Sequence, residues 1–353
     1  MRKPSRRVSA ADVAAAAGVS QTAVSFVLNG RDSGNIAADT KKRILEAADR
    51  LGYEPHFVAK SLRSRTTQSI GVVTDAVATS VFGGRLLAAA IERAHADGRI
   101  LLLMDLLDRD ELGPAAIREL ERRQVDALIH VTMGFRVLDQ LPESRIPLVL
   151  ANCTARRADE WSVYPDDAYG ATRALEHLVG LGHRRLAMLT GRWAPDAGLP
   201  DPGNISGPIR RDAFVAAARL HGAEVTVVET GWGINDGYHA AMQVLDVPPR
   251  ERPTAIFAIT DRAAVGAILA AARHGLSVPE DLSIIGFDDE EKMADCSVPP
   301  LTTIALPHAA MGDIAVTMAI AAAGGKTVDE PQRVLPCELL VRESTAPPKP
   351  ARR

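Results

Sequence analysis

The 353-residue sequence contains few cysteines, few aromatic residues and no long apolar run. Its three cysteines (Cys153, Cys296 and Cys337) lie far apart and form no CxxC pair, which excludes a disulfide scaffold and indicates reduced residues of a cytosolic protein. Aromatic residues make up 4% of the chain, and this scarcity favours helices and α/β layers over β-sandwiches. No apolar run approaches the roughly 20 residues of a membrane span. None follows the basic residues 2–7 either, so we expect neither a membrane segment nor a signal peptide.

Sequence motifs of enzymes are also missing. Gly325-Lys326-Thr327 ends like a phosphate-binding P-loop, but Ile320 occupies the position of its first glycine. The glycines in 231–237 have the wrong last spacing for a dinucleotide fingerprint, and there is neither an HExxH nor a GxSxG motif. The histidines form no cluster with metal-ligand spacing. We therefore expect no enzyme, no metal site and no cofactor.

Charge is divided unevenly along the chain. Residues 1–65 contain 12 Lys and Arg against 6 Asp and Glu, whereas the remainder contains 29 against 38. A basic segment on an acidic body is typical of proteins that bind nucleic acid, because basic side chains release the counterions condensed on phosphates. Charge alone leaves a solubilising tail open as the alternative.

The first part of the chain predicts three short helices. Residues 9–12 (SAAD) have the spacing of a capping box, before a helix that Gly18 ends. Ser20 is a second N-cap candidate before a helix over 21–28, and a third helix runs from about 39 to 50. Two short helices joined by a tight turn with a glycine form the helix-turn-helix pattern, so this segment is a candidate DNA-binding head.

From residue 69 onward, short apolar runs alternate with helical segments. We expect strands at 69–74, 100–104, 126–131, 146–151, 185–190, 224–229, 254–259 and 282–287. Between them we expect helices at about 83–97, 114–123, 168–181, 210–221, 236–245 and 262–274. Strands that alternate with helices imply parallel, doubly wound sheets, and this number of strands fits two similar lobes.

Three head segments agree in order and distance with a known family. ADVAAAAGVSQTAVSFVLNG, TKKRILEAADRLGYEP and VAKSLRSRTTQSIGVV resemble, without gaps over residues 8–73, the head of the lac repressor family (LacI/GalR) of bacterial transcription regulators. LVGLGHRRLAMLTG, RPTAIFAITDRAAVGA, VPEDLSIIGFDD and PPLTTIALP resemble the core of the same family. The resemblance implies a small all-α helix-turn-helix head and an α/β, periplasmic-binding-protein-like core of two doubly wound parallel-sheet lobes.

The resemblance also implies the division of the chain. We expect a head over 1–53, a hinge over 54–68, a core over 69–345 and a disordered tail over 346–353. In this family the chain crosses between the lobes three times, here expected near residues 165, 304 and 329. The N-lobe would then hold about 69–165 and 305–328, and the C-lobe about 166–303 and 330–345.

The second helix of the head is the expected DNA-reading element. In a helix-turn-helix the N-terminal residues of this helix reach base edges in the major groove, and here they are Gln21 and Thr22, with Ser25 and Phe26 one turn later. Glutamine can bond adenine with both ends of its amide, and threonine can offer its methyl group to thymine. This chain has Ala23 and Phe26 where the family often has Thr and Arg, so no operator sequence can be transferred.

Further DNA contacts are expected around the helix caps and in the hinge. The candidates are Ser9, Ser20, Asn29, His56, Ala59, Lys60 and Leu62. Ser9, Ser20 and Asn29 either bond phosphates or only cap helices. In the family the hinge folds into a helix on DNA, and the residue that matches Leu62 opens a base step in the minor groove as an apolar wedge.

A ligand site is expected between the lobes, where the carboxyl ends of the strands face each other. The residues that match the family's ligand-facing positions are Asp75, Phe82, Asn152, Arg210, Trp232, Thr260 and Asp288, and Trp193 is a further candidate in the long loop 191–209. A sugar suits these residue types, because Arg and Asp bond vicinal hydroxyls and an aromatic face stacks on C–H groups. The alternatives are that Asp261 and Asp288 only cap helices, that Arg210 pairs with an acid, and that the loop is a solvated insertion.

Together these features predict a sequence-specific DNA-binding transcriptional regulator. We expect a cytoplasmic repressor that binds a near-palindromic double-stranded operator as a homodimer and responds to a small molecule, most simply a sugar. The sequence leaves open whether the effector releases or promotes DNA binding, and whether the dimer pairs further into a tetramer. A cytosolic sugar-binding or sugar-modifying protein with a basic head is the alternative from another class.

Overall fold

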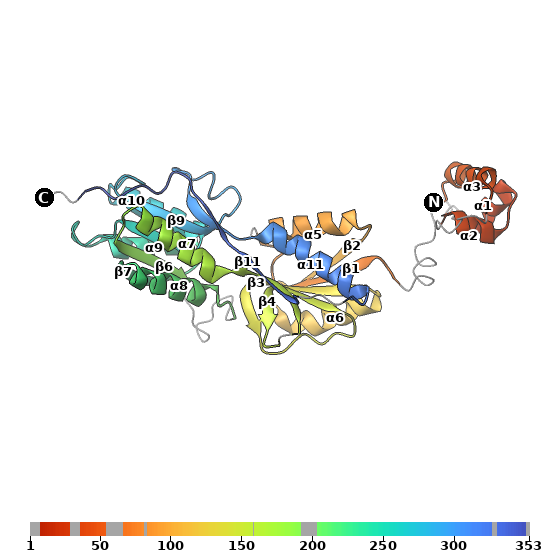
Figure 1. Ribbon diagram of the computed structural model, residues 1–353, viewed down its shortest axis with the longest axis horizontal. Coiled ribbons are helices and arrows are strands. Elements are labelled where there is room, and N and C mark those ends of the chain that lie inside the picture. Colours follow the sequence, from red (N-terminus) through yellow and green to blue (C-terminus); the bar gives the residue numbers. More distant parts are fainter. Residues whose placement is uncertain are drawn as a thin grey trace, which may run out of the picture. The chain divides into compact units, whose positions relative to one another are not determined.

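The computed structural model describes residues 8–28, 36–53, 66–80, 83–157, 159–191, 203–326 and 330–350. The chain forms two compact units, Met1–Thr67 and Gln68–Arg353, which we call the head and the core (Figure 1). The head is helical, and the core contains two parallel-sheet α/β lobes. The predicted fold class is therefore confirmed.

Three helices surround a small apolar core in the head. They are α1 (Ala10–Ala17), α2 (Gln21–Leu28) and α3 (Ala38–Leu51). Ile44, Ala47 and Ala48 line one face of α3 at helical spacing and are buried against valines of α1 and α2. Among the described residues no single helix is long and apolar enough to cross a membrane; α1 and α2 reach that length only as a pair bent by 104°.

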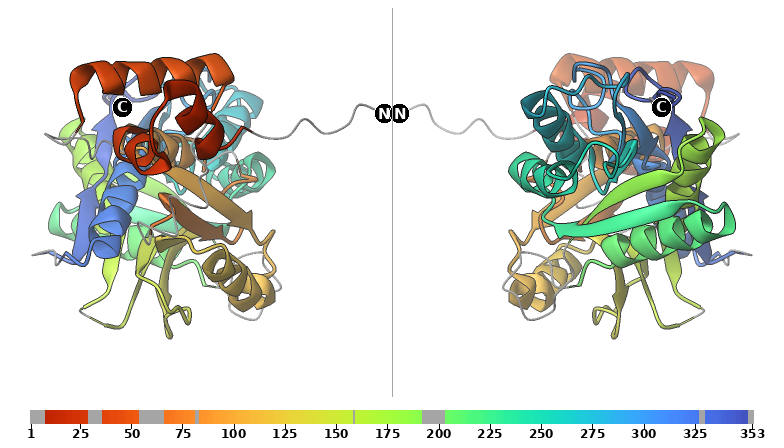
Figure 2. Two further views of the ribbon diagram at one scale, coloured as in Figure 1. Left: turned by 90° about the vertical axis from the view of Figure 1, so that its right-hand side faces the viewer. Right: turned by 90° about the vertical axis from the view of Figure 1, so that its left-hand side faces the viewer.

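The N-lobe is built on a six-stranded parallel sheet in the order β11-β5-β4-β3-β1-β2. Its strands are β1 (Ser69–Thr74), β2 (Ile100–Asp105), β3 (Ala127–Leu138), β4 (Leu148–Ala155), β5 (Trp161–Asp166) and β11 (Gln332–Pro336). Helices α5 (Gly84–Ala96) and α11 (His308–Ala323) pack together on one face, and η1 (Asp110–Leu112) leads into α6 (Gly113–Arg122) on the other (Figure 2). Every residue of β1 is buried because helices cover both faces of the sheet.

The C-lobe repeats this plan with the order β12-β10-β9-β8-β6-β7. Its strands are β6 (Arg185–Gly191), β7 (Glu224–Thr230), β8 (Ala255–Ala258), β9 (Ser283–Asp288), β10 (Thr302–Ala305) and β12 (Glu338–Leu340), of which only β12 runs antiparallel to its neighbour. Helices α7 (Asp167–Gly180) and α8 (Ser206–Leu220) pack together on one face, and α9 (Ile234–Leu245) and α10 (Asp261–Arg273) on the other (Figure 1). Buried residues of all four helices and of the central strands form one apolar core.

The chain passes between the two lobes three times. The first passage joins β5 to α7 after Asp166, and the second joins β10 to α11 at 306–307, close to the expected positions 165 and 304. The third lies at Cys337 and not near 329, because β11 pairs with β5 and extends the N-lobe sheet. The C-terminal part of the N-lobe therefore reaches Pro336, beyond the predicted end at 328.

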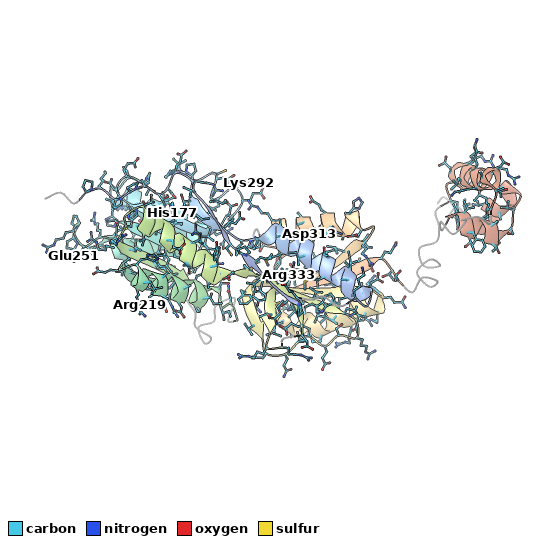
Figure 3. The ribbon with its side chains drawn as sticks, in the orientation of Figure 1. His177, Arg219, Glu251, Lys292, Asp313 and Arg333 are labelled. Atoms are coloured by element: carbon cyan, nitrogen blue, oxygen red, sulfur yellow. The ribbon has the colours of Figure 1, made fainter. Side chains whose placement is uncertain are left out.

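The segment after 345 is ordered where the structure describes it, in contrast to the predicted disordered tail. Ala346 donates its N–H to Ser283 Oγ at 3.0 Å, and Lys349 pairs with Asp281 at 2.6 Å. One residue earlier, Thr345 Oγ1 lies 2.9 Å from Nε2 of His177, which is labelled in Figure 3. These hydrogen bonds fix residues 346–350 along the C-lobe, and residues 351–353 lie outside the described part.

Candidate functional site

The two short helices of the head are held by their caps. The Ser9 hydroxyl accepts from Asp12 N, and the Asp12 carboxylate accepts from Ser9 N at 2.8 Å, which completes the predicted capping box. Gly18 ends α1 at φ 66°, a left-handed conformation that glycine adopts without strain. Ser20 Oγ accepts from Ala23 N at 3.2 Å and caps α2. Both serines are therefore helix caps, and a phosphate contact by either remains a prediction.

The outer face of α2 carries the residues predicted to read bases. Val24 and Val27 point into the head's core, which leaves Gln21 and Thr22 exposed at the helix start. Phe26 is 40% exposed one turn later, and Ser25 is half-buried beside it. An apolar side chain can contact the thymine methyl at a base edge, and base reading by this face of α2 stays a prediction. The predicted contacts Asn29, His56, Ala59, Lys60 and Leu62 lie outside the described residues.

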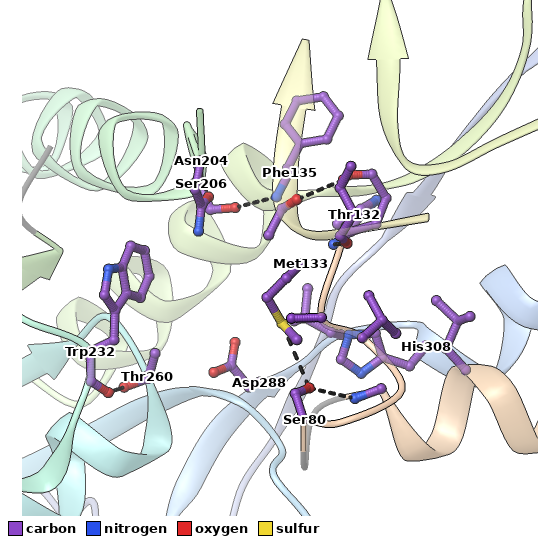
Figure 4. A pocket seen from close by; sticks show the side chains of 18 of the residues that line it. Ser80, Thr132, Met133, Phe135, Asn204, Ser206, Trp232, Thr260, Asp288 and His308 are labelled. Atoms are coloured by element: carbon purple, nitrogen blue, oxygen red, sulfur yellow. Dashed lines mark hydrogen bonds between the residues drawn. The ribbon is translucent and has the colours of Figure 1, made fainter. Parts of the chain in front are cut away.

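In the core, a cavity of about 350 Å³ lies between the two lobes (Figure 4). The N-lobe contributes, among others, Val77, Ser80, Leu86, Thr132, Met133, Phe135, Asn152 and His308, and the C-lobe Asn204, Ser206, Arg210, Trp232, Thr260 and Asp288. Five of the predicted ligand contacts therefore lie together on its wall: Asn152, Arg210, Trp232, Thr260 and Asp288. Phe82 and Trp193 lie outside the described residues, so their assignment stays a prediction.

Asp75 does not line this cavity, although it directly follows β1. Its carboxylate is buried and accepts the N–H groups of Met133 and Ala76 at 2.9 and 2.7 Å. Arg136 Nη2 lies 3.2 Å away as its ionic partner. Burial raises the pKa of the Asp75 carboxyl, while these hydrogen bonds and Arg136 oppose the rise. Asp75 thus holds Met133 in the cavity wall rather than facing a ligand itself.

An irregular segment of β3 supplies the N-lobe wall opposite the C-lobe. The β3–β4 register shifts between Val131 and Arg136, which lets the residues between them leave the ladder. Gly134 adopts φ 73°, and a Cβ there would lie 2.2 Å from Asn204 Nδ2 of the C-lobe. The Asn152 amide donates to Thr132 O at 3.0 Å, and the Thr132 hydroxyl donates to Asn152 O at 2.9 Å. These two hydrogen bonds fix the shape of the segment.

A buried cluster of charges forms the C-lobe side of the cavity. Arg210 extends from α8 and is only 3% exposed. Its Nε donates to Asp167 Oδ1 at 2.6 Å, and its Nη1 donates to Asp288 Oδ1 at 3.3 Å and to Ile259 O at 2.8 Å. The guanidinium also lies over the Phe287 ring, 3.6 Å from its centre. The alternative that Arg210 pairs with an acid therefore holds, and its partners come from α7 and from the end of β9.

Burial is the main cause of the raised carboxyl pKa values in this cluster. It raises the pKa of the Asp288 carboxyl to about 7, with Arg210 lowering it and Asp167 raising it further. Burial also raises the pKa of Asp167, which Arg210 opposes. The neighbouring Asp261 has a pKa well above its ordinary value because it is buried and close to Asp288. Near neutral pH the Asp288 carboxyl is thus close to the midpoint of its titration.

Thr260 and Trp232 form a pair at the same edge of the C-lobe sheet. Thr260 Oγ1 accepts from Ala263 N and caps α10, and it donates to Trp232 O at 3.0 Å. Asp261 is not a cap, because its carboxylate accepts from Thr303 Oγ1 and Glu290 N. The threonine hydroxyl is used twice within the protein and fixes the backbone of Trp232, whose indole lies on the cavity wall (Figure 4).

The residue run after β9 connects the cavity to other parts of the core. Asp288 faces Arg210, whereas Asp289 pairs with Arg85 of the N-lobe helix α5 at 2.9 Å. Asp289 also pairs with Arg342 at 2.6 Å. Glu290 pairs with Arg262 of α10, so three consecutive acids have separate arginine partners. Asp288 and Asp289 adopt φ 111° and 51°, which fixes a sharp turn between them.

Several cavity residues were not predicted from the sequence. Met133 and Phe135 were missed because the strand was expected to end at 131, and no local signal marks the register shift. His308 was missed because no helix was expected at α11. Burial beside Arg85 and Arg210 lowers the pKa of His308 to about 4, so it faces the cavity as a neutral ring. Asp167, which pairs with Arg210 behind the cavity wall, was missed because it directly follows Asp166, the N-cap of α7.

A helix-turn-helix head followed by two lobes around a cavity defines a class of DNA-binding regulators with a ligand-binding core. The head matches the family model of bacterial regulatory proteins of the lacI family over residues 10–56, and residues 175–345 match a periplasmic binding protein-like domain. The transcriptional regulator DegA of Bacillus subtilis is 32% identical over 345 residues, which cover 95% of this chain and 97% of DegA. The chain belongs to the lacI family of bacterial transcriptional regulators.

Other relatives agree with this assignment. The transcriptional repressor PurR of Edwardsiella ictaluri is 31% identical, with coverage of 95% of this chain and 96% of PurR. Among solved structures, a Lac repressor dimer bound to operator and the anti-inducer ONPF superposes with a TM-score of 0.79 at 27% identity. That match covers 97% of this chain and all of the Lac repressor chain. This protein is accordingly a DNA-binding transcriptional regulator.

Proposed function

We propose that this regulator is a repressor that binds a near-palindromic operator as a homodimer and is controlled by a sugar held between the lobes of its core. The observation that carries the proposal is the interlobe cavity, in a chain that also has a helix-turn-helix head. A cavity whose two walls belong to different lobes is closed or opened by lobe movement. Such a regulator acts on the bacterial chromosome, in the cytoplasm.

The cavity chemistry supports a sugar as the effector. The indole of Trp232 offers a flat face for ring C–H groups, and the Asp288 carboxyl points into the space between the lobes (Figure 4). Asp288 and the guanidinium of Arg210 present an acceptor and a donor together, which suits neighbouring hydroxyls. The volume of about 350 Å³ fits a small ring compound and lies at the lower end of the range for ligand pockets.

Exposed apolar side chains support the homodimer. Ile91 on α5 and Ile100 and Leu103 on the edge strand β2 are 57%, 55% and 45% exposed. An open sheet edge with apolar side chains is a surface that proteins usually cover. The similar Lac repressor is described as a dimer on its operator, which supports the same assembly here.

The coupling between ligand and DNA follows from the three chain passages between the lobes. A ligand that contacts both walls changes the free energy of lobe closure, and β1 of the N-lobe follows the head and hinge directly in the chain. Coupling between sites of this kind is worth about 1–3 kcal/mol, or roughly 5- to 150-fold in affinity. The effector should therefore shift operator affinity within this range.

Operator selection followed by ligand titration tests the proposal. A preferred duplex is selected from random double-stranded DNA, and fluorescence anisotropy then measures its affinity with and without a panel of sugars. We expect a two-fold symmetric site and an affinity change with at least one sugar, which Arg210→Ala abolishes while ligand-free DNA binding persists. Failure to select any preferred site would contradict the regulator, and a response that survives Arg210→Ala would remove Arg210 from the effector site.

The hinge assignment has its own test. Leu62→Ala should weaken binding to the selected operator far more than binding to unrelated DNA, because an apolar wedge acts only where the duplex opens. Lys60→Ala is the matched comparison, since loss of a phosphate contact weakens both kinds of DNA to a similar degree. Equal losses for both DNAs in Leu62→Ala would refute the wedge.

A further inference from the structure

We propose that the interlobe cavity selects an uncharged ligand, and that Asp167 sets this preference by compensating the charge of Arg210. The inference rests on the proposed function, because it narrows the chemical class of the effector. A preference for uncharged ligands would distinguish a free sugar from its phosphate ester, two compounds of similar shape. The preference depends on the carboxyl groups that pair with Arg210 at the cavity wall and behind it.

Arg210 is the one guanidinium among the described residues that line the cavity. An anionic ligand would need this positive charge, yet two carboxylates already share it. Asp167 accepts from Nε at 2.6 Å and Asp288 from Nη1 at 3.3 Å, both in a buried setting. With both acids ionised, the three side chains together carry one negative charge. The guanidinium can still donate hydrogen bonds to a neutral hydroxyl, but it offers no net attraction to an anion.

The protonation of the cluster shows that the site resists additional negative charge. Burial raises the pKa of Asp288 to about 7, and the charge of Asp167 contributes to that rise. A site that disfavours ionisation of its own carboxyl disfavours a phosphate or carboxylate brought by a ligand even more, because like charges repel strongly away from water. The other basic side chain on the described wall, His308, has a pKa lowered to about 4 and is neutral.

The Asp167 carboxylate interacts first with Arg210 and, to a smaller extent, with the Ser206 hydroxyl. Asp166 caps α7 by accepting from Tyr169 N at 2.9 Å, so Asp167 is not needed for the helix start. The Asp167 side chain instead extends to Arg210 of α8 and is almost completely buried. Asparagine at this position could keep the hydrogen bond to Nε without the charge. The negative charge of Asp167, rather than its shape, is therefore what makes the cavity unsuitable for anions.

The rest of the described wall is suited to an uncharged ring. Val77, Leu86, Met133, Phe135 and Trp232 contribute apolar surface on both lobes. Polar groups on the wall are hydroxyls, amides and a neutral imidazole, which bond hydroxyl groups of a ligand without supplying charge. Asp108 adds a further acid at the exposed rim. Size, polarity and charge thus agree on a neutral, hydroxylated ring compound.

Phosphate binding to charge-altered variants tests the inference, with inorganic phosphate as the anionic probe. The wild type, Asp167→Asn and the double variant Asp167→Asn/Asp288→Asn place −1, 0 and +1 on the cluster when the acids are ionised. Thermal unfolding is followed by tryptophan fluorescence in inorganic phosphate and in sodium chloride of equal ionic strength at pH 8. The three tryptophans lie at 161, 193 and 232, so phosphate bound to the basic head does not affect the signal directly.

We expect phosphate to stabilise the wild type only by the gradual, non-saturating amount that an excluded salt gives every variant, Arg210→Met included. The double variant should gain a saturable stabilisation, with phosphate affinity increased by roughly tenfold or more, as expected for one charge-assisted hydrogen bond. Asp167→Asn should lie between the two, and adding Arg210→Met to the double variant should abolish the gain. Saturable phosphate binding by the wild type that Arg210→Met removes would overturn the inference, and so would a folded double variant without any gain.

Asp212→Asn is the matched control. Asp212 lies on the same helix as Arg210 and pairs with Arg211, but its side chain is 69% exposed. An equal gain in this variant would show that only the overall charge of the core matters, which would also overturn the inference. If Asp167→Asn does not fold, Asp288→Asn removes one charge from the other side of the guanidinium and carries the same expectation.

Operator measurements separate this inference from the proposed function. A sugar phosphate that changes operator affinity of the wild type through Arg210 would preserve the ligand-controlled regulator and refute the uncharged-ligand preference. If the phosphate results follow the expected order but no sugar changes operator affinity, the charge selectivity stands and the sugar-controlled repressor fails.

Discussion

Replacing Asp288 by asparagine should change how the stability of the core depends on pH. In the folded core burial raises the pKa of this carboxyl from 3.8 to about 7, so the folded state retains a proton that the unfolded chain releases near pH 4. A carboxyl with a raised pKa contributes stability that is fully present below the unfolded pKa and is lost as pH rises through the folded pKa. The wild-type core should therefore lose stability between about pH 4 and pH 7. Asp288→Asn should lack this loss.

The size of the effect follows from the shift in pKa. About three pKa units at roughly 1.4 kcal/mol each correspond to about 4 kcal/mol between pH 4 and pH 8. Asp288 is only 6% exposed, so solvent screens this cost little. Removing the charge of Asp288 should also lower the raised pKa of Asp261, because that charge contributes to it, and this adds to the effect in the same direction. The free energy of unfolding of the wild type, relative to that of Asp288→Asn, should thus decrease as the pH rises.

Urea unfolding at several pH values between 4 and 8, followed by tryptophan fluorescence, measures this difference. All three tryptophans belong to the core, so the signal reports the unit that contains Asp288. Asp212→Asn serves as the control, since an exposed carboxylate should leave the shape of the profile unchanged. Parallel profiles for the wild type and Asp288→Asn would refute the argument, because they would mean that Asp288 titrates alike in the folded and unfolded chain.

Three further perturbations address the head and the lobe contact. Ser9→Ala removes the capping box shared with Asp12 and should lower head stability by about 1 kcal/mol; calorimetry should show a lower head transition with the core transition unchanged, and a shift of both would contradict it. Gln21→Ala should cost about 1–3 kcal/mol on the selected operator in anisotropy, whereas an equal loss on unrelated DNA would exclude base reading. Arg85→Met removes the ion pair with Asp289, but Arg85 is 42% exposed, so urea unfolding should show a loss of at most about 1 kcal/mol; a loss of several kcal/mol would indicate that the pair behaves as a buried one.

Elements with a strong local signal were predicted closely from the sequence. The strand at 69–74 and the helix at 21–28 have the predicted bounds, because a β-branched apolar run and a capped, periodic segment are local properties. Strand β11 (QRVLP) was missed, since its alternation is weak and its partner β5 is far away in the chain. Helix α11 was missed because its sequence is apolar almost all round, which removes the pattern of an amphipathic helix.

For the cavity wall too, the sequence predicted some residues, whereas contacts between distant segments of the chain were missed. Trp232 and Thr260 were predicted because they match the family's ligand-facing positions, which lie where the carboxyl ends of parallel strands meet at one edge. Asp75 follows a strand too, but its carboxylate is occupied by the backbone of a neighbouring strand, which no local pattern reveals. Asp167 and His308 reach the cavity region only because the chain changes lobes beside them, and the sequence gives no distance across such a passage.

The run of three acids after β9 brings the cavity wall and a contact between the lobes close together in the chain. Asp288 lies on the cavity wall and Asp289 pairs with Arg85 of the opposite lobe, so one peptide bond separates a carboxyl of the cavity wall from a contact between the lobes. The left-handed backbone at both residues couples their orientations, because rotation at one redirects the other. No chain of intermediate side chains is needed to join the cavity wall to the opposite lobe at this point, because the two acids are adjacent residues of the same turn.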